Sequence, residues 1–495
     1  MVKAWSGDAG QIALGKVSDD SGAVLEAWTG PQVAWTMARG GAGAFGGKTI
    51  NSTSVWLTFC GLFLLGLADL RRPRSLRNLD LLALLSFTIS LRFFNEGEIF
   101  WSAPLAYPPL LYLLARCLWI ARRDRPPSSG RPLWPVWLLA GLAVFLAGFR
   151  VGLNVEAPRS VIDVGFAGVV GGQRIVNGQM PYGHMPEQGD LEACGPADAE
   201  GEIRERIQTN GRCEASNPRG DTYGPVSYLA YVPGYLAFGW TGKWDELWAA
   251  HATSLLFDAL CLVGLALVGR RYGGNRLGAT LAFAWAAYPF TLYVSNSNTN
   301  DAIMPAFLIW GFWLASSPWA RGAAVALAGW TKFAALLLAP LWLSYPQARR
   351  TPSRRFVAAF ALTTVAAFAI LLLEPDPLHA ARVFAERTLG FQLDRESPFS
   401  IWGWGQYRAR GVPDLHRVQQ ALQVLLVGGA VLVAFVPRHR SPLRLAALTA
   451  VLLIGFELVL THWFYLYIPW FFPFVAFAVL ATGSGRDVER VEPVH

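Results

Sequence analysis

The stretch that decides the fold is Arg150–Pro233, which reads RVGLNVEAPRSVIDVGFAGVVGGQRIVNGQMPYGHMPEQGDLEACGPADAEGEIRERIQTNGRCEASNPRGDTYGPVSYLAYVP. It is the long polar segment of a chain that is apolar over most of its length. A hydrophobic run, Leu133–Leu153, leads into it, and nearly all the sequence beyond it is again apolar. We therefore predict a large loop outside a membrane, held by hydrophobic helices before and after it, that carries the functional residues.

Composition supports this interpretation. Of the 495 residues, 53% are hydrophobic and only 15% are charged, whereas soluble domains average about 25% charged residues. The apolar runs are roughly 16 to 22 residues long, which suits helices that cross a hydrocarbon core about 30 Å thick. The sequence therefore predicts an all-α polytopic membrane protein. Its net charge of +8 is explained by basic cytoplasmic loops, so nucleic acid is not needed as a partner.

The apolar runs predict about thirteen crossings, of which the late run Arg321–Leu343 supplies two. The others are expected at Ile50–Leu70, Leu79–Phe94, Pro104–Ala121, Leu133–Leu153, Trp248–Gly269, Leu277–Ser295, Ala302–Ser316, Phe356–Leu373, Gln420–Val436, Leu443–Leu460 and Trp463–Leu480. Basic connectors follow the first and third runs, whereas Glu96 and Glu98 make the second connector acidic. Because Lys and Arg collect in cytoplasmic loops, the long polar loop is expected outside.

Two later segments decide the rest of the topology. Tyr223–Trp240 is apolar but interrupted by prolines, and a crossing there would put the basic turn at Arg270 outside, so we expect it to lie at the outer surface. Arg321–Leu343 contains Lys332, and a charge in mid-membrane costs roughly 3 kcal/mol or more. Two short helices with an apex at Lys332 avoid that cost.

This topology divides the chain into four parts. The Gly-rich start has no apolar core of the signal-peptide type and allows a flexible arm. The predicted parts are an N-terminal segment at 1–49, three additional helices at 50–132, a transmembrane core at 133–481 with outer loops at 154–247 and 374–417, and a cytoplasmic tail at 482–495.

The five cysteines form no metal-binding pattern. Cys60, Cys117 and Cys261 lie in apolar runs and are expected to be small core residues, whereas Cys194 and Cys213 lie in the polar loop. If that loop faces an oxidising compartment, a disulfide between them would contribute about 3 kcal/mol, and the sequence leaves the bridge open. No loop shows a carboxylate cluster for a metal, so neither metal nor cofactor is expected.

Unusual polar groups collect on the predicted outer side. Besides Lys332 they are Asp163, Arg174, His184, Asp221, the run Asn296–Asp301, Arg387, Gln392, Asp394, Arg395, Glu396 and His462. Carboxylates beside several cations suit a reaction whose donor is a phosphate. The cations bind and stabilise the phosphate as it leaves, and a carboxylate takes the proton of an attacking hydroxyl.

Each of these groups also has a plainer explanation. A loop aspartate such as Asp163 is often a capping or solvated residue, and outer arginines can face lipid headgroups. Asn296–Asp301 suits a helix-capping turn, and the intramembrane Asp258 can pair with another helix. The aromatic run Trp463–Tyr467 is typical of an interfacial belt, although such rings also stack on sugars.

The order of these segments resembles the GT-C class of membrane glycosyltransferases, and within it the actinobacterial glycosyltransferase family 87. The segments that carry the resemblance are Ile162–Phe166, Gly178–Gly183, Asp221–Pro225, Ser295–Asp301, Gly329–Phe333 and Arg387–Ser400, within a similarity that spans roughly Leu133–Leu480. Two features differ from the family pattern: three helices precede the core, and Asp163 is followed by Val164 rather than by a second acid.

The resemblance implies roles for individual residues. Asp163 is the implied general base for the acceptor hydroxyl. The substrate- and phosphate-binding residues are expected among Arg174, Tyr182, Tyr223, Asn298, Asp301, Lys332, Arg387, Arg395 and His462.

The function expected from this resemblance is an inverting glycosyl transfer in the plasma membrane. A mannose- or arabinofuranose-type sugar would pass from a polyprenyl-phosphate donor to a cell-envelope glycan or glycolipid on the outer face. Two alternatives stay open. A lipid-linked-sugar flippase would use the same cations without chemistry, and a non-catalytic scaffold of an envelope-assembly complex would tolerate loss of Asp163.

Overall fold

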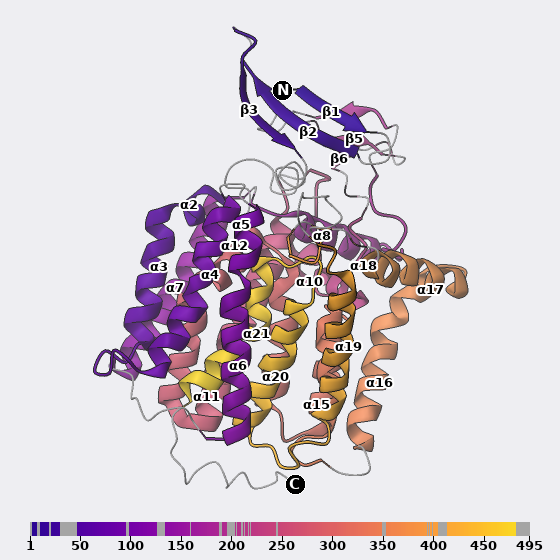
Figure 1. Ribbon diagram of the computed structural model, residues 1–495. Helices are drawn as coiled ribbons and strands as arrows, with labels where there is room; N and C mark the ends of the chain where they lie inside the picture. The colour runs from indigo at the N-terminus through magenta and orange to yellow at the C-terminus, as the bar shows by residue number, and fades with distance from the viewer. Residues whose placement is uncertain are drawn as a thin grey trace.

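The computed structural model is mostly helical, as the apolar runs predict (Figure 1). It describes residues 2–6, 10–18, 21–29, 47–95, 99–125, 134–158, 160–187, 191–195, 203, 205–208, 211, 213–215, 217, 219–243, 246–348, 353–393, 395, 397, 399–403 and 413–481. The predicted tail at 482–495 and the acidic connector with Glu96 and Glu98 lie outside these ranges. Within them, four helices are long and apolar enough to cross a membrane, namely Trp101–Arg123, Val136–Glu156, Trp248–Ala287 and Arg354–Leu373.

The helices lie close to the predicted apolar runs. The first group comprises α2 (Gly47–Asn51), α3 (Thr53–Leu67), α4 (Leu76–Asn95), α5 (Ile99–Leu105), α6 (Tyr107–Arg123) and α7 (Val136–Glu156). After the polar loop come α11 (Trp248–Ala287), α12 (Pro289–Ser297), η1 (Asn300–Ala302), α13 (Ile303–Trp313), α14 (Pro318–Gly329), η2 (Phe333–Leu338), α15 (Ala339–Leu343), α16 (Arg354–Phe368), η3 (Ala369–Leu373), α19 (His416–Leu432), α20 (Pro442–Leu458), η5 (Tyr465–Tyr467) and α21 (Ile468–Leu480).

Two breaks in these helices explain how the chain reverses. α11 is interrupted at Gly273 and Gly274, and Gly274 has φ +75°, a conformation that glycine adopts without strain. Gly269 and Gly278 then lie so close that a Cβ on Gly269 would stand 2.5 Å from the nitrogen of Gly278. The two halves of α11 therefore pack back to back, as expected for two separate runs. The second break is at Lys332, between α14 and η2, where two short helices were expected.

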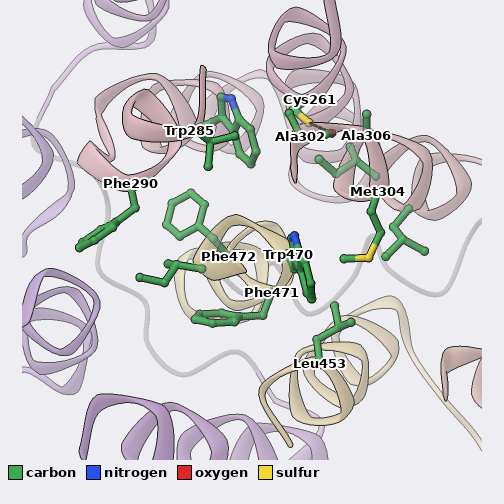
Figure 2. Packing of buried hydrophobic residues seen from close by; sticks show 14 of the residues in the cluster. Cys261, Trp285, Phe290, Ala302, Met304, Ala306, Leu453, Trp470, Phe471 and Phe472 are labelled. Atoms are coloured by element: carbon green, nitrogen blue, oxygen red, sulfur yellow. Dashed lines mark hydrogen bonds between the residues drawn. The ribbon is translucent and has the colours of Figure 1, made fainter. Parts of the chain in front are cut away.

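Aromatic packing holds the bundle together. Phe472 of α21 stacks on Tyr288 at a centroid distance of 4.2 Å, and Trp285, Phe471 and Trp470 surround the same region with almost no exposed surface (Figure 2). Helices in a membrane do not exclude water when they pack against one another. Close packing of this kind therefore stabilises the bundle through van der Waals contacts.

The basic turns meet at one end of the bundle. Arg444 of α20 donates from Nε to the carbonyl of Ala121 in α6 at 2.7 Å, and its guanidinium lies 3.3 Å from the Asp124 carboxylate. Arg440 donates to the carbonyl of Ser344, after α15, at 2.8 Å. Turns that were expected on one side of the membrane are therefore neighbours in space.

The polar loops lie at the other end. In Figure 1, the turn between α19 and α20 is at the bottom, whereas the loop helices α8, α10, α17 and α18 lie in the upper part of the helical bundle, below the strands. Their bounds, with those of two further short elements, are α8 (Asp163–Val176), α9 (Pro225–Leu229), α10 (Val232–Phe238), α17 (Pro377–Ala385), the π-helical turn η4 (Glu386–Gly390) and α18 (Phe391–Leu393). The segment Tyr223–Trp240 thus breaks into helices of 5 and 7 residues, each too short to cross a bilayer.

Two small sheets, which the sequence did not predict, accompany the helices. Residues 1–49, expected as a flexible arm, include an antiparallel sheet of β1 (Val2–Ser6), β2 (Gly10–Val17) and β3 (Val24–Thr29). The polar loop contains a second sheet of β4 (Ala193–Cys194), β5 (Glu205–Ile207) and β6 (Cys213–Ala215). Both were missed because these strands carry no extended apolar run. In the second sheet, Cys194 and Cys213 form a disulfide.

The placement of Arg150 in the polar loop is wrong. Arg150 lies inside α7, with no exposed surface, and its guanidinium is 2.5 Å from the carboxylate of Asp258 in α11. It also donates to the carbonyls of Trp285 and Ala286 at 2.8 and 2.9 Å. Asp258 therefore pairs with a residue of a neighbouring helix, which is the structural role considered for it from the sequence. The polar loop begins only after Glu156.

Candidate functional site

A buried ion pair lies at the loop end of the bundle. Lys332 Nζ is 3.1 Å from Asp301 Oδ1, with side-chain exposures of only 7% and 2%. Trp470 donates from Nε1 to the same oxygen at 3.0 Å, and the hydroxyl of Thr299 donates to the other carboxylate oxygen. Asp301 is therefore fully engaged by the protein, and it neutralises the lysine that the sequence singled out.

Aromatic rings surround the ammonium of Lys332. The Nζ atom lies 4.2 Å from the ring centroid of Tyr223, 5.6 Å from that of Trp470 and 5.8 Å from that of Tyr467. Tyr467 and Trp470 stack on each other at 4.2 Å. Each ring face attracts a cation within about 6 Å, so Lys332 is held by a carboxylate and three rings rather than by water.

Asp163 stands at the start of α8, beside this pair. Its Oδ1 accepts a hydrogen bond from its neighbour's amide, Val164 N, at 2.9 Å, and the side chain is exposed. Gly165 allows the approach of the helix, because a Cβ there would lie 2.2 Å from the carbonyl oxygen of Asn298. The chain thus brings the start of α8 directly against the turn that carries Asp301.

The surroundings of Asp163 change its acidity. Desolvation by the protein around it raises the pKa of the Asp163 carboxyl, and the amide hydrogen bond and the cations Arg395 and Lys332 oppose that rise. The side chain therefore reaches solvent while much of its environment is protein. A carboxylate with a raised pKa is a stronger base than a free aspartate, which suits general-base catalysis.

His462 and Arg395 complete the cluster. The Nδ1 atom of His462 is 2.8 Å from the hydroxyl of Ser397, and burial, with the nearby cations Arg395 and Lys332, holds the pKa of His462 well below its usual range. The imidazole is therefore neutral at pH 7. Arg395 acts electrostatically on Asp163 and His462 alike, although it is remote from both in sequence.

A second ion pair lies next to the first group. Arg387 of η4 holds Asp221 by two contacts, Nε to Oδ2 at 2.7 Å and Nη2 to Oδ1 at 2.6 Å. The amide of Gly183 donates to the same carboxylate at 2.7 Å. Tyr182 is buried beside it, and its hydroxyl donates to the carbonyl of Tyr223 at 2.9 Å. These contacts fasten the 178–183 and 221–225 segments to the late loop.

The structure separates the predicted site residues into two sets. Asp163, Tyr223, Asp301, Lys332, Arg395 and His462 belong to one electrostatic cluster. Arg174, Asn298, Tyr182 and Arg387 do not face it as free ligands. Arg174 is at the far end of α8 and donates to the carbonyl of Met180 at 2.9 Å. Asn298 is buried, adopts φ +53°, and donates to the carbonyl of Ser160 at 2.7 Å.

Sequence reasoning missed two members of the site. Trp470 was assigned only to a transmembrane helix, and Tyr467 only to an aromatic run that suits either a belt or a sugar platform. Their spacing of three residues puts both rings on one side of the helix start, and Lys332 in an apolar run needs such partners. Those two facts together were the available signal.

The described part of the chain offers no group of three or more His, Cys, Asp or Glu side chains placed to hold a metal ion. No protein-family model matches this chain, and no curated protein is significantly similar to it. Function is therefore inferred from the chain's own residues.

Proposed function

We propose that the protein is an integral membrane glycosyltransferase of the GT-C class. It transfers a mannose- or arabinofuranose-type sugar from a polyprenyl phosphate to an envelope glycan or glycolipid on the outer face. The observation that carries the proposal is the position of Asp163. An exposed carboxylate with a raised pKa stands beside Arg395 and the Lys332–Asp301 pair, at one end of an apolar bundle.

The chemistry follows from the charges around Asp163. The acceptor hydroxyl gives its proton to the Asp163 carboxylate, and its oxygen forms a bond to the anomeric carbon of the sugar. The bond between that carbon and the phosphate oxygen breaks, and the electron pair leaves with the polyprenyl phosphate. Cations stabilise the negative charge that develops on the phosphate, and attack from the opposite side inverts the anomeric configuration.

The architecture supports the proposal at a coarser level. About thirteen crossings would place the contacting turns at Arg440, Arg444 and Asp124 in the cytoplasm and the cluster outside, in agreement with the charge rule. The disulfide Cys194–Cys213 belongs to the same loop as Asp163, and such bonds persist in oxidising compartments. A plasma-membrane protein with an extracytoplasmic site accounts for both features.

Tyr467, which is half-buried and stacks on the buried Trp470, provides a ring face that suits a sugar. Stacked aromatic rings next to a carboxylate bind the C–H faces of pyranose and furanose rings, whereas the hydroxyls require polar partners. Tyr223 and His462 are half-buried and lie at the same cluster. The neutral imidazole of His462 suits a hydrogen bond to a sugar hydroxyl better than a charge contact to phosphate.

The test is transfer by the purified full-length protein. It is incubated with polyprenyl-phosphate mannose or arabinofuranose and mixed envelope lipids, and released polyprenyl phosphate is measured. Asp163→Asn keeps the shape and removes the base, so release should fall by about 100-fold or more. The matched control is Asp376→Asn, because Asp376 also starts an outer helix, accepting from the amides of Leu378 and His379.

Three outcomes are distinct. Loss of release in Asp163→Asn with full release in Asp376→Asn supports the proposal. Equal release by wild type and Asp163→Asn keeps the transferase and rejects Asp163 as its base. No release with any donor rejects the transferase and leaves the flippase or the scaffold.

A further inference from the structure

Most of the cations near the site already have partners within the protein. Lys332 is paired with Asp301, and Arg387 is paired with Asp221 through two contacts. Arg174 donates to a backbone carbonyl at the far end of α8. A phosphate that approached these groups would have to displace a carboxylate or carbonyl that is already in place. The donor phosphate therefore needs other partners.

Two arginines meet this requirement. The guanidinium carbon of Arg219 lies 5.8 Å from the ring centroid of Phe391, and that of Arg395 lies 5.5 Å from the same centroid. Arg219 is exposed and Arg395 is half-buried. Within the described ranges, no carboxylate forms an ion pair with either side chain. Both charges are therefore available to an anion from solution or from the membrane surface.

The backbone places Arg219 next to Asp163. Asn217 donates from Nδ2 to the backbone carbonyl of Asp163 at 3.5 Å. Gly220 packs against α8, because a Cβ there would lie 2.8 Å from the Cβ of Ala167. The carbonyl of Gly220 accepts from the hydroxyl of Tyr228 at 2.8 Å. The residue between these anchors, Arg219, is held at the first turns of the helix that begins with Asp163.

The Asp221–Arg387 pair holds the ring of Phe391 close to Arg219 and Arg395. Asp221 follows Arg219 by two residues, and Arg387 precedes Phe391 by four, which is about one helical turn. The bidentate contact between Asp221 and Arg387 therefore joins the loop of Arg219 to the helix of Phe391. The Asp221–Arg387 pair therefore positions Arg219 and Arg395 and does not itself bind the anion.

Exposed leucines adjoin the same ring. Leu389 is 49% exposed and Leu393 is 86% exposed, and both lie within two residues of Phe391. Leu378 of α17 is also 82% exposed. Cations that contact Phe391, together with exposed leucines within two residues of it, match a ligand with a phosphate head and a hydrocarbon chain.

We infer that Arg219 and Arg395, spaced by Phe391, bind the phosphate of the polyprenyl donor, and that Leu389 and Leu393 contact its hydrocarbon chain. This assignment rests on the proposed function and goes further, because it adds Arg219 to the expected phosphate partners and leaves out Arg174, Lys332 and Arg387. Arg219 contacts the phosphate from the exposed polar loop, and Arg395 contacts it from the side of the cluster around Asp163. The leaving phosphate then lies between the base and the membrane surface.

Binding of a polyprenyl phosphate to the full-length protein in detergent tests the inference. Dissociation constants are measured without acceptor or sugar for wild type, Arg219→Gln and Arg395→Gln. Each substitution removes charge-assisted hydrogen bonds and should weaken binding by about tenfold or more. The matched control is Arg382→Gln, because Arg382 is exposed on the neighbouring helix α17 and has no ring contact among the described residues.

The outcomes separate the phosphate sources. Weaker binding in Arg219→Gln and Arg395→Gln, with unchanged binding in Arg382→Gln, supports the inference. Competition by phosphatidylglycerol at equal concentration would overturn it in favour of a general headgroup contact, and equal affinities of all variants would overturn it outright. Because binding is measured separately from transfer, a protein that binds polyprenyl phosphate but shows no release in the transfer assay would reject the proposed function alone. Turnover with an unchanged KM in Arg219→Gln would reject only this inference.

Discussion

Breaking the Lys332–Asp301 pair should destabilise the protein strongly. Asp301→Asn leaves the ammonium of Lys332, 7% exposed, without its carboxylate, although the three rings remain. Removing one partner of a buried ion pair typically costs about 3–5 kcal/mol, because the other charge stays uncompensated. Lys332→Met should cost a similar amount, since it leaves the Asp301 carboxylate with only Thr299 and Trp470 as donors.

The double variant is the informative one. Asp301→Asn combined with Lys332→Met removes both charges, so its cost should fall short of the sum of the single variants by about 2–3 kcal/mol. Unfolding free energies in one detergent measure this coupling, and Lys243→Met, at an exposed lysine, serves as the control. Strictly additive costs would refute the reasoning. Lys332 would then carry a free charge, and it would replace Arg219 as the first candidate for phosphate binding.

Four further outcomes are expected. The raised pKa of Asp163 means that the folded state binds its proton more tightly than the unfolded state. Wild-type stability should therefore fall as pH rises from the ordinary aspartate range through that raised pKa, a fall that thermal unfolding of Asp163→Asn should lack. The acid limb of the transfer rate should lie above the pH at which a free aspartate titrates. Asp258→Asn should lower the unfolding free energy by about 3–5 kcal/mol, because Arg150 stays buried. Cys194→Ser should lower it by about 3 kcal/mol through loss of the bond to Cys213, whereas equal stability in reducing and oxidising buffer would contradict this.

Local sequence patterns predicted the helices well. Apolar length marks a helix in a membrane protein because each backbone polar group must be satisfied within its own segment. The break at Lys332 was predicted from the cost of a charge in hydrocarbon, and the structure ends α14 at Gly329 and begins η2 at Phe333. The reversal at Gly273 and Gly274 was predicted from the basic turn around it. In each case the evidence lay within a few residues of the feature.

Pairings over long distances were not predictable in this way. Trp470 donates to Asp301 across 169 positions, and Arg387 holds Asp221 across 166. Arg150 was assigned to the polar loop because the alternation of inside and outside connectors puts that stretch outside, and only the fold shows that Asp258 reaches it. Hydrophobic periodicity describes which face of a segment is apolar, but it carries no information about which other segment that face meets.

The cations that stand out in the sequence are, for a physical reason, poor candidates for binding a ligand. Lys332 attracted notice because it lies in an apolar run, yet an apolar environment is where an unpaired charge costs most. Such a residue therefore requires a partner from its own chain, and Lys332 has Asp301. Arg219 and Arg395 lie in polar loops where unpaired charge is tolerated, and of the two only Arg395 was noticed in the sequence. A site that must accept and release a phosphate draws on charges of the second kind.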